Sequence, residues 1–163
     1  MIDDEVKAVI MAIVIVAGAL SIAQIAMSGK VSEPFSALGL LGPNMKIGDY
    51  PKTVLVNQTI RLYLYIDNHE GRTMYYIIYA KLGDKLTEIS ENKSADAPIL
   101  YTYEVILSHG MNTTIPVSLR FSKPMTNARL IFEMWIYDPE TRTPRYHGRW
   151  NQLWLNITAT TIS

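Results

Sequence analysis

The pattern of apolar and polar positions divides the chain into one unbroken apolar run near its start and a long region of alternation after it. Residues 9–27 (VIMAIVIVAGALSIAQIAM) contain no charged side chain, and only Ser21 and Gln24 are polar. A helix of about 20 such residues crosses the hydrocarbon core of a bilayer. We therefore expect residues 1–28 to form a cytoplasmic leader followed by a transmembrane helix.

Other interpretations of this run stay open. A secretory signal has a basic start, a short apolar core and a cleavage site of small residues. Here the leader is net acidic, and the run continues well beyond the nearest such site, Ala17-Gly18-Ala19. An uncleaved anchor is therefore favoured over a cleaved signal. A pilin-type helix that packs in a filament is a further alternative, because small residues allow close contact between helices.

Residues 29–51 are interrupted by glycine and proline at several positions, which prevents a long helix. The same segment contains Phe35, Leu38, Leu40 and Leu41, unlike a fully solvated linker. We expect a juxtamembrane tether that either dips into the membrane interface or begins the folded domain. Docking onto a partner in the membrane is a third interpretation.

From residue 52 the apolar period is two, which is typical of strands with one buried face. Residues 59–67, for example, place four aliphatic side chains on one face, and Pro116 indicates an edge strand. Polar residues 82–98 are expected to form the most exposed connection. The pattern predicts an antiparallel β-sandwich of about seven strands over residues 52–163. Six of its expected strands are 59–67, 72–81, 99–107, 114–121, 127–137 and 150–160.

Composition limits the partners and the chemistry. Fifteen basic and fifteen acidic residues give a formal net charge of 0, so no basic surplus indicates nucleic acid binding. The chain contains no cysteine, which excludes disulfides and thiolate metal ligands. We expect no cofactor.

Flanking positive charge does not decide the orientation across the membrane, because Lys7 lies on one side of the apolar run and Lys30 on the other. The orientation is therefore predicted from glycosylation sequons. Four N-x-S/T patterns mark candidate sites of N-linked glycans, although such patterns also occur in ordinary turns. They favour a cytoplasmic N-terminus and an extracellular C-terminal domain in the cell membrane. The candidate asparagines are Asn57, Asn92, Asn112 and Asn156.

Reactive side chains are densest in residues 67–72 (DNHEGR), where Glu70 could act as a general acid or base with His69. A charged hairpin turn around Gly71 is the favoured interpretation. His109 and His147 lie in other expected loops, so a histidine metal site would require the three loops to converge. No serine or cysteine nucleophile motif and no phosphate-binding loop is present. We expect neither catalytic residues nor a metal ligand set.

Aromatic strand residues could form a platform for a glycan or a protein, although cross-strand packing is the more ordinary role for such side chains. Candidate partner-binding residues are His69, Glu70, Arg72, Trp135 and Trp150.

Four features together resemble a family of archaeal membrane-anchored proteins catalogued only as a domain of unknown function. They are the apolar N-terminal helix and the segments 35–43 (FSALGLLGP), 67–72 (DNHEGR) and 129–135 (RLIFEMW). The resemblance implies an envelope protein with an Ig-like ectodomain and implies no catalytic residue. The order of elements after Leu107 is also similar to adhesion-type Ig-like modules of prokaryotic surface proteins.

The sequence thus predicts a membrane-anchored envelope protein whose ectodomain binds a protein or glycan, or serves as accessory subunit of a membrane complex. One alternative is a subunit of an extracellular pilus-like filament. A second is an enzyme or metal-binding subunit that uses the 68–72 turn.

Overall fold

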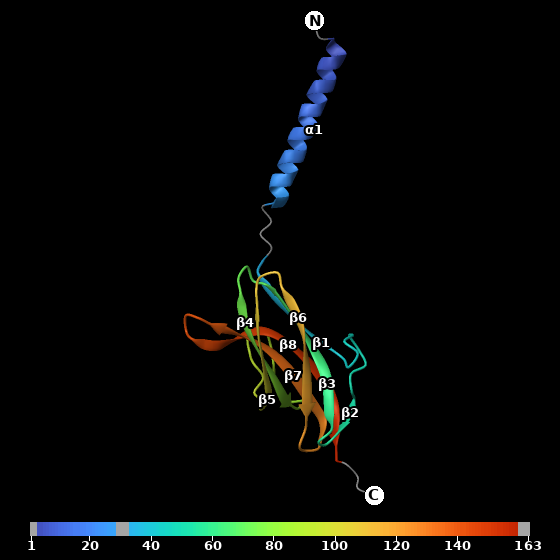
Figure 1. Ribbon diagram of the computed structural model, residues 1–163, viewed down its shortest axis with the longest axis vertical. Helices are drawn as coiled ribbons and strands as arrows, with labels where there is room; N and C mark the ends of the chain where they lie inside the picture. Colours follow the sequence, from blue (N-terminus) through green and yellow to red (C-terminus); the bar gives the residue numbers. More distant parts are fainter. Residues whose placement is uncertain (1–2, 29–32, 160–163) are drawn as a thin grey trace. The chain divides into compact units, whose positions relative to one another are not determined.

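The computed structural model describes residues 3–28 and 33–159, which belong to two separate units. One unit holds a single helix, α1 (Asp4–Ser28), and the other, from Pro34 onward, holds every strand (Figure 1). Residues 29–32 of the expected tether and residue 160, the final residue of the expected last strand, lie outside the described residues.

The helix α1 follows directly from its composition. Its alanine, leucine and methionine residues are good helix formers, whereas its valines and isoleucines are weaker ones, and Asp4 and Glu5 in the first turn complement the positive end of the helix dipole. Within it, the 21 residues Asp4–Gln24 are long and apolar enough to cross a membrane, a property that a signal sequence shares. The helix therefore meets the physical requirement for a spanning segment.

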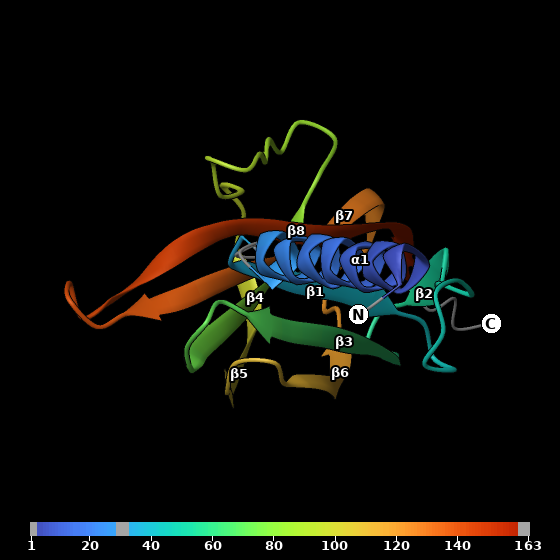
Figure 2. The same ribbon diagram turned by 90° about the horizontal axis from the view of Figure 1, so that it is seen from above.

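The second unit is a two-sheet β-sandwich, which confirms the predicted mainly-β, Ig-like fold class. One sheet has the strand order β1-β3-β6 and the other β2-β8-β7-β4-β5, so the described residues form eight strands (Figures 1 and 2). All pairings are antiparallel except β2 with β8, which is parallel. The strands are β1 (Phe35–Leu41), β2 (Thr53–Leu55), β3 (Thr59–His69), β4 (Met74–Gly83), β5 (Ile99–Leu107), β6 (Asn112–Arg120), β7 (Met125–Asp138) and β8 (Thr143–Thr158).

The core lies between the two sheets and is built by alternate residues of each strand. On β3, Leu62, Leu64 and Ile66 are fully buried, and on β7 Leu130 and Phe132 face them across the interior. Burying each such side chain contributes roughly 1.5–3 kcal/mol. The alternate apolar residues that predicted these strands are therefore the residues that face the core.

Strand β1 comes from the segment expected to be a tether. It pairs with β3 from Phe35 opposite His69 to Leu41 opposite Tyr63. Its apolar residues pack against the core, which explains why the segment is less polar than a solvated linker. The domain boundary expected at residue 52 therefore moves to Pro34. We call the end of the sandwich where β1 begins and β3 ends the proximal end, and the opposite end the distal end.

Strand β8 begins at Thr143, seven residues before the expected start at residue 150. Its first residues pair with the last residues of β7, so that the hairpin extends beyond the sheet (Figure 1). β7 is last paired with β4 at Ile136, so the extension begins after that residue, and the β7–β8 register shift between Met134 and Trp135 lies just before it. Thr143, Pro144 and Arg145 at the start of β8 are exposed, so this part of the strand has no apolar alternation and could not be distinguished from a turn.

Candidate functional site

The polar turn between β3 and β4 is held in place by Asn68. This fully buried side chain donates from Nδ2 to the carbonyl oxygens of Arg72 (2.9 Å) and Leu107 (2.7 Å). Its Oδ1 accepts a hydrogen bond from the Glu70 N–H at 2.9 Å. Gly71, with φ of 75°, adopts the left-handed conformation that the turn requires. The turn is therefore a fixed structure that aims Glu70 at the rest of the proximal end.

Glu70 lies at the centre of a polar cluster of four side chains, which we call the Glu70 cluster. Its Oε1 accepts a hydrogen bond from the Ser36 hydroxyl (2.6 Å) and lies 3.1 Å from Nε2 of His147. Ser36 is also 2.8 Å from the hydroxyl of Tyr76, which is buried. The cluster thus joins β1, β4 and β8 to the β3–β4 turn.

The protonation of the cluster follows from these contacts. Burial alone raises the pKa of the Glu70 carboxyl, but hydrogen bonds from Ser36 and His147, with nearby positive charge, outweigh it and hold the pKa below its usual value. A carboxylate needs a donor, so Nε2 of His147 carries the hydrogen. The buried Nδ1 of the same ring has no hydrogen-bond partner among the described residues.

The Glu70 cluster contains the residue types of a serine hydrolase triad without its geometry. In such a triad, a histidine accepts the proton of the serine hydroxyl. Here Ser36 and His147 both contact the same oxygen of Glu70, and Ser36 is only 2% exposed. The cluster is therefore arranged to fasten elements together rather than to generate a nucleophile.

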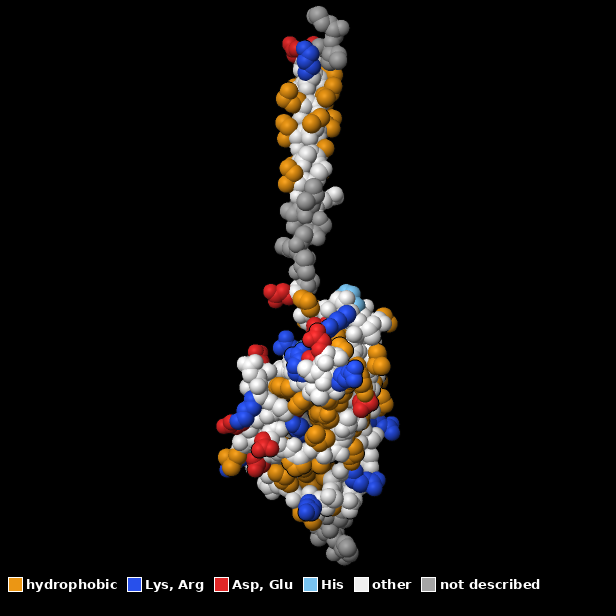
Figure 3. Space-filling model, turned by 90° about the vertical axis from the view of Figure 1, so that its left-hand side faces the viewer, with side chains coloured by type: hydrophobic (Ala, Val, Ile, Leu, Met, Phe, Trp, Pro, Cys, Tyr) orange, Lys and Arg blue, Asp and Glu red, His pale blue; other side chains and the backbone are white. Residues whose placement is uncertain are grey.

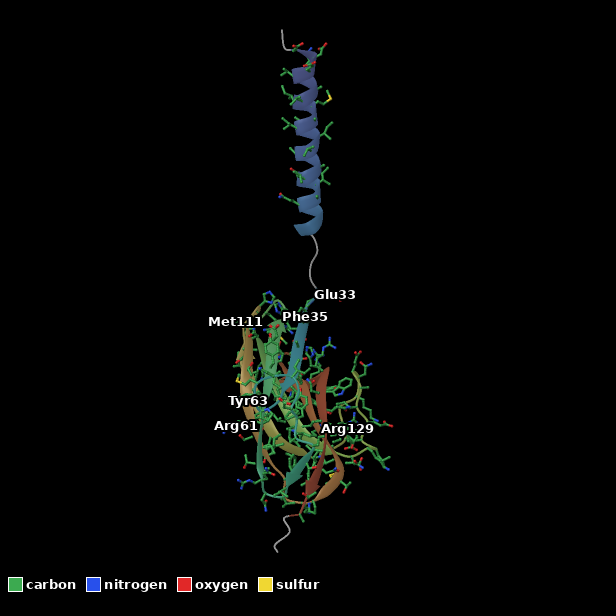
Figure 4. All side chains as sticks on the ribbon, turned by 90° about the vertical axis from the view of Figure 1, so that its right-hand side faces the viewer. Glu33, Phe35, Arg61, Tyr63, Met111 and Arg129 are labelled. Carbon is green, nitrogen blue, oxygen red and sulfur yellow. The ribbon has the colours of Figure 1, made fainter. Side chains whose placement is uncertain are left out.

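Beside this cluster, the outer surface of the proximal end carries exposed rings. The ring of Phe35 stacks on His69 with centroids 4.8 Å apart, and His69 meets His109 edge-on at 5.9 Å. Nδ1 of His109 accepts a hydrogen bond from the Gly71 N–H. Phe35 and Met111 lie together at this end (Figure 4). Two histidines therefore form part of an accessible surface.

The three histidines gather at the proximal end but do not form a metal site. His69 and His109 contact each other, whereas His147 contacts Glu70 instead. Among residues 3–28 and 33–159, no three His, Asp or Glu side chains converge as a metal ion requires.

Trp135 lies on the outer face of the five-stranded sheet, away from the core between the sheets. Its ring contacts Tyr79 at 5.4 Å and Tyr146 at 5.6 Å between centroids, and the Lys81 ammonium lies 5.8 Å from it. Trp150 is half-buried on the same face, opposite Glu133. Trp135 therefore packs on its two tyrosine neighbours.

A buried ion pair beneath these rings was not predicted. The Lys81 ammonium lies 3.0 Å from the Glu133 carboxylate, with the two side chains 7% and 0% exposed. Glu133 also accepts hydrogen bonds from Ala95 N–H (2.6 Å), the Ser94 hydroxyl (2.9 Å) and the Trp135 indole (3.0 Å). Lys81 donates in turn to Ser94 and to the Ala95 carbonyl, each at 2.8 Å.

This pair fastens the connection between β4 and β5 to the sheet. Residues 84–98 are largely exposed, as expected, but Ala95 within them is only 3% exposed. Glu133 does point away from the sandwich core, as the alternation indicated, and this connection then covers it. The local sequence around Glu133 does not predict its burial, because the residues that bury it, Ser94 and Ala95, lie about 40 positions earlier in the chain.

The predicted partner-binding residues fall into two groups, which lie on the two sides of strand β8. His69, Glu70 and Arg72 lie at the proximal turn, where His147 meets Glu70. Trp135 and Trp150 lie on the other side, where Tyr146, the neighbour of His147 in sequence, meets Trp135. Of these five residues, Arg72 is exposed and the others are partly buried.

The sequon asparagines occupy different surroundings. Asn57, Asn92 and Asn112 are exposed, and Asn57 adopts a positive φ of 64° in the turn between β2 and β3. Asn156 is half-buried on β8, and its Oδ1 accepts a hydrogen bond from the Asn127 N–H at 2.9 Å. Three of the four candidates are therefore readily accessible, and their glycosylation stays a prediction.

Comparison with known proteins adds a family and a set of similar folds. The family model described as a domain of unknown function (DUF1616) matches residues 29–156. No curated protein matches the chain. Among solved structures, the CARDB domain of the PF1109 protein from Pyrococcus furiosus is 9% identical, with a TM-score of 0.46 over 78% of this chain and 90% of that one.

A β-glucosidase from Listeria innocua is also similar, at 11% identity and a TM-score of 0.46 over 76% of this chain. The chain spans only 16% of that enzyme's length. Neither likeness extends to an activity or a ligand.

Proposed function

The chain belongs to the family of the domain of unknown function DUF1616, and we propose that it is a membrane-anchored envelope protein that binds a partner. In this proposal the N-terminus is cytoplasmic, and the sandwich lies outside the cell membrane. The partner is a protein or glycan of the envelope, or a membrane complex to which this chain is an accessory subunit.

The observation that carries the anchor is the exposure of apolar side chains on α1. Met11, Leu20 and Ile22 are 62–69% exposed. The 21 residues Asp4–Gln24 rise about 32 Å as a helix, close to the thickness of the hydrocarbon core. Lipid is the environment that satisfies such a surface at the lowest free energy, since every backbone polar group is bonded within the helix.

Orientation is supported by the exposed sequons. The lysines that flank the apolar run lie one on each side, so they do not favour the opposite orientation. Asn57, Asn92 and Asn112 lie on the surface of the sandwich, where a glycosylating enzyme has access. N-linked glycans would be attached outside the cytoplasm.

Binding is favoured over catalysis by the state of the reactive side chains. Ser36 and Glu70 hydrogen-bond to each other and to neighbouring strands, and the serine is buried. The accessible members of the same end, His69 and Arg72, can contact a partner without any rearrangement of the cluster. We therefore propose no catalytic residue, no metal ligand and no cofactor.

The absence of cysteine makes the topology directly testable. Single cysteines at exposed positions, Asp3→Cys and Lys85→Cys, would be treated on intact cells with a membrane-impermeant maleimide. We expect Lys85→Cys to react at once and Asp3→Cys to react only after permeabilisation. The reverse pattern would refute the orientation. Reaction of both variants on intact cells would refute the cytoplasmic leader.

Two further measurements separate the alternatives. Carbonate washing should leave the protein in the membrane fraction and detergent should release it, whereas recovery from sheared surface fibres would support the filament subunit. Intact mass then reports whether the N-terminal residues have been removed and whether glycans have been added. A bare-chain mass would remove the sequon argument while leaving the maleimide result to determine orientation.

A further inference from the structure

Strand β5 is an edge of the five-stranded sheet and carries exposed apolar side chains. It pairs with β4 on one side, and no strand of the described residues pairs with the other. Ile99, Leu100 and Ile106 are 50%, 37% and 66% exposed. Hydrophobic side chains gather on the face shown in Figure 3, the side on which β4 and β5 lie in Figure 1.

The other sheet edges in the described part of the chain are shielded, whereas β5 is interrupted only by a β-bulge at Leu100, near its first residue, and is regular from Tyr101 to Leu107. β2 is only three residues long, Pro116 removes a backbone donor from β6, and the Leu38 carbonyl of β1 accepts a hydrogen bond from Asn151. Soluble proteins protect long edges with lysine, proline or bulges against pairing with another chain. β5 has nine residues without proline, lysine or arginine (ILYTYEVIL).

The inner side of β5 is fixed in position, so its outer edge is already ordered. The hydroxyl of Tyr101 exchanges hydrogen bonds with the backbone of Arg120 on β6, accepting from its N–H at 3.0 Å and donating to its carbonyl at 3.2 Å. On the outer face, Tyr75 of β4 donates to Glu104 at 2.7 Å. A strand held on both faces loses little conformational freedom when a further strand is added.

We propose that β5 pairs antiparallel with β5 of a second copy of this chain, about a two-fold axis at Tyr103. This register pairs Tyr101–Val105 without interruption, and the β-bulge at Leu100 lies at each end of that ladder, near Ile106 of the other copy. On the outer face it places Thr102 opposite Glu104 twice, and it brings the exposed Leu100 at the bulge near the exposed Ile106 twice. Apolar residues then meet apolar residues, and neither glutamate faces the other, which is the favourable arrangement for cross-strand pairs.

Other registers that keep the two outer faces together are less complementary. An axis at Thr102 places Leu100 opposite Glu104 and brings Pro98 into the ladder. An axis at Glu104 places the two carboxylates directly opposite each other, which is destabilising. A shift by a single residue between the strands places outer side chains opposite inner ones. The sequence of β5 therefore selects one pairing with itself.

Cysteine pairing tests this register in the otherwise cysteine-free full-length chain. The variants Thr102→Cys and Glu104→Cys, differently tagged and mixed in detergent with a mild oxidant, should form mainly the mixed disulfide. In the proposed register these residues are opposite, with Cβ atoms about 5 Å apart, whereas two copies of either are diagonal neighbours about 7–8 Å apart. Mainly same-residue disulfides, or none, would refute the register.

Association is tested separately from the register and from the helix. The mass of the full chain in detergent should rise from monomer to dimer with concentration, and Ile106→Lys should abolish that rise. Ile47→Lys is the matched control, because Ile47 is 86% exposed and lies outside β5. A dimer that persists in Ile106→Lys would show association outside β5 and would refute the β5 interface. A wild-type monomer at every concentration would refute it too. If Ile106→Lys fails to fold, the disulfide pattern still decides the question.

Failure here leaves the proposed anchor and orientation intact, since the maleimide and carbonate results do not depend on β5.

Discussion

Replacing Glu133 with glutamine removes the charge opposite Lys81 while keeping the shape of the side chain. The Lys81 ammonium, 7% exposed, would then retain only Ser94 and the Ala95 carbonyl as polar partners besides a neutral amide. Breaking a buried ion pair by removing one partner costs about 3–5 kcal/mol, because the remaining charge stays desolvated. A loss of this size is a large part of the 5–15 kcal/mol typical of domain stability.

The assay is thermal and urea unfolding of the full chain in detergent, followed by circular dichroism of the sandwich and by tryptophan fluorescence. Trp135 donates to Glu133 and therefore reports on the site itself. We expect the melting temperature to fall by about 10–15 °C for Glu133→Gln. Lys93→Met is the control, because the Lys93–Glu88 pair has a similar short distance of 2.6 Å but is exposed, and we expect no resolvable change there.

A double variant separates charge pairing from other contacts. Lys81→Met combined with Glu133→Leu removes both charges together, so its free-energy cost should be smaller than the sum of the two single changes. Strict additivity would refute the reasoning. So would a Glu133→Gln protein as stable as the wild type, because the burial of the pair would then have no energetic consequence.

Two further perturbations test other parts of the domain. Because the pKa of Glu70 is lowered in the folded state, its contribution to stability is present above the ordinary value of 4.5 and is lost as pH falls through the lowered pKa. Glu70→Gln should therefore be less stable than the wild type at neutral pH and converge with it in acid, and a pH-independent difference would contradict this. Gly148→Ala should destabilise the domain by about 1–3 kcal/mol in urea titration, because its φ is 80° and a Cβ would lie 2.5 Å from the Glu91 carbonyl oxygen. Gly110→Ala, with a φ of 76° but open space, is the matched control, and an equal loss in both variants would show that the Glu91 contact is unimportant.

The strands that alternation predicted are those with the core on one face and solvent on the other. β3 and β6 follow this rule, so local sequence was sufficient to find them. β1 was expected to be part of a tether, because Gly39 and the Gly42-Pro43 pair resemble a linker. Its strand conformation depends on the register with β3, which joins residues more than 20 positions apart.

The candidate site was predictable only in part for the same reason. The 67–72 turn could be identified as the densest polar cluster, and its Gly71 does have a positive φ. The partners that define the role of Glu70 are Ser36, 34 residues away, and His147, 77 residues away. No local pattern predicts that two such distant side chains share one carboxylate oxygen.

The place of β1 in the sandwich has a mechanical consequence. The chain enters β1 at Phe35 and runs antiparallel to β3 through seven residue pairs. Tension applied from the N-terminal side would therefore pull β1 along its own axis, and the ladder would be loaded in shear, with its hydrogen bonds resisting together rather than opening one after another. The Ser36–Glu70 hydrogen bond lies beside the first pair and would resist the same displacement. A domain attached in this way would resist unravelling from its N-terminal side when it is held from the opposite end.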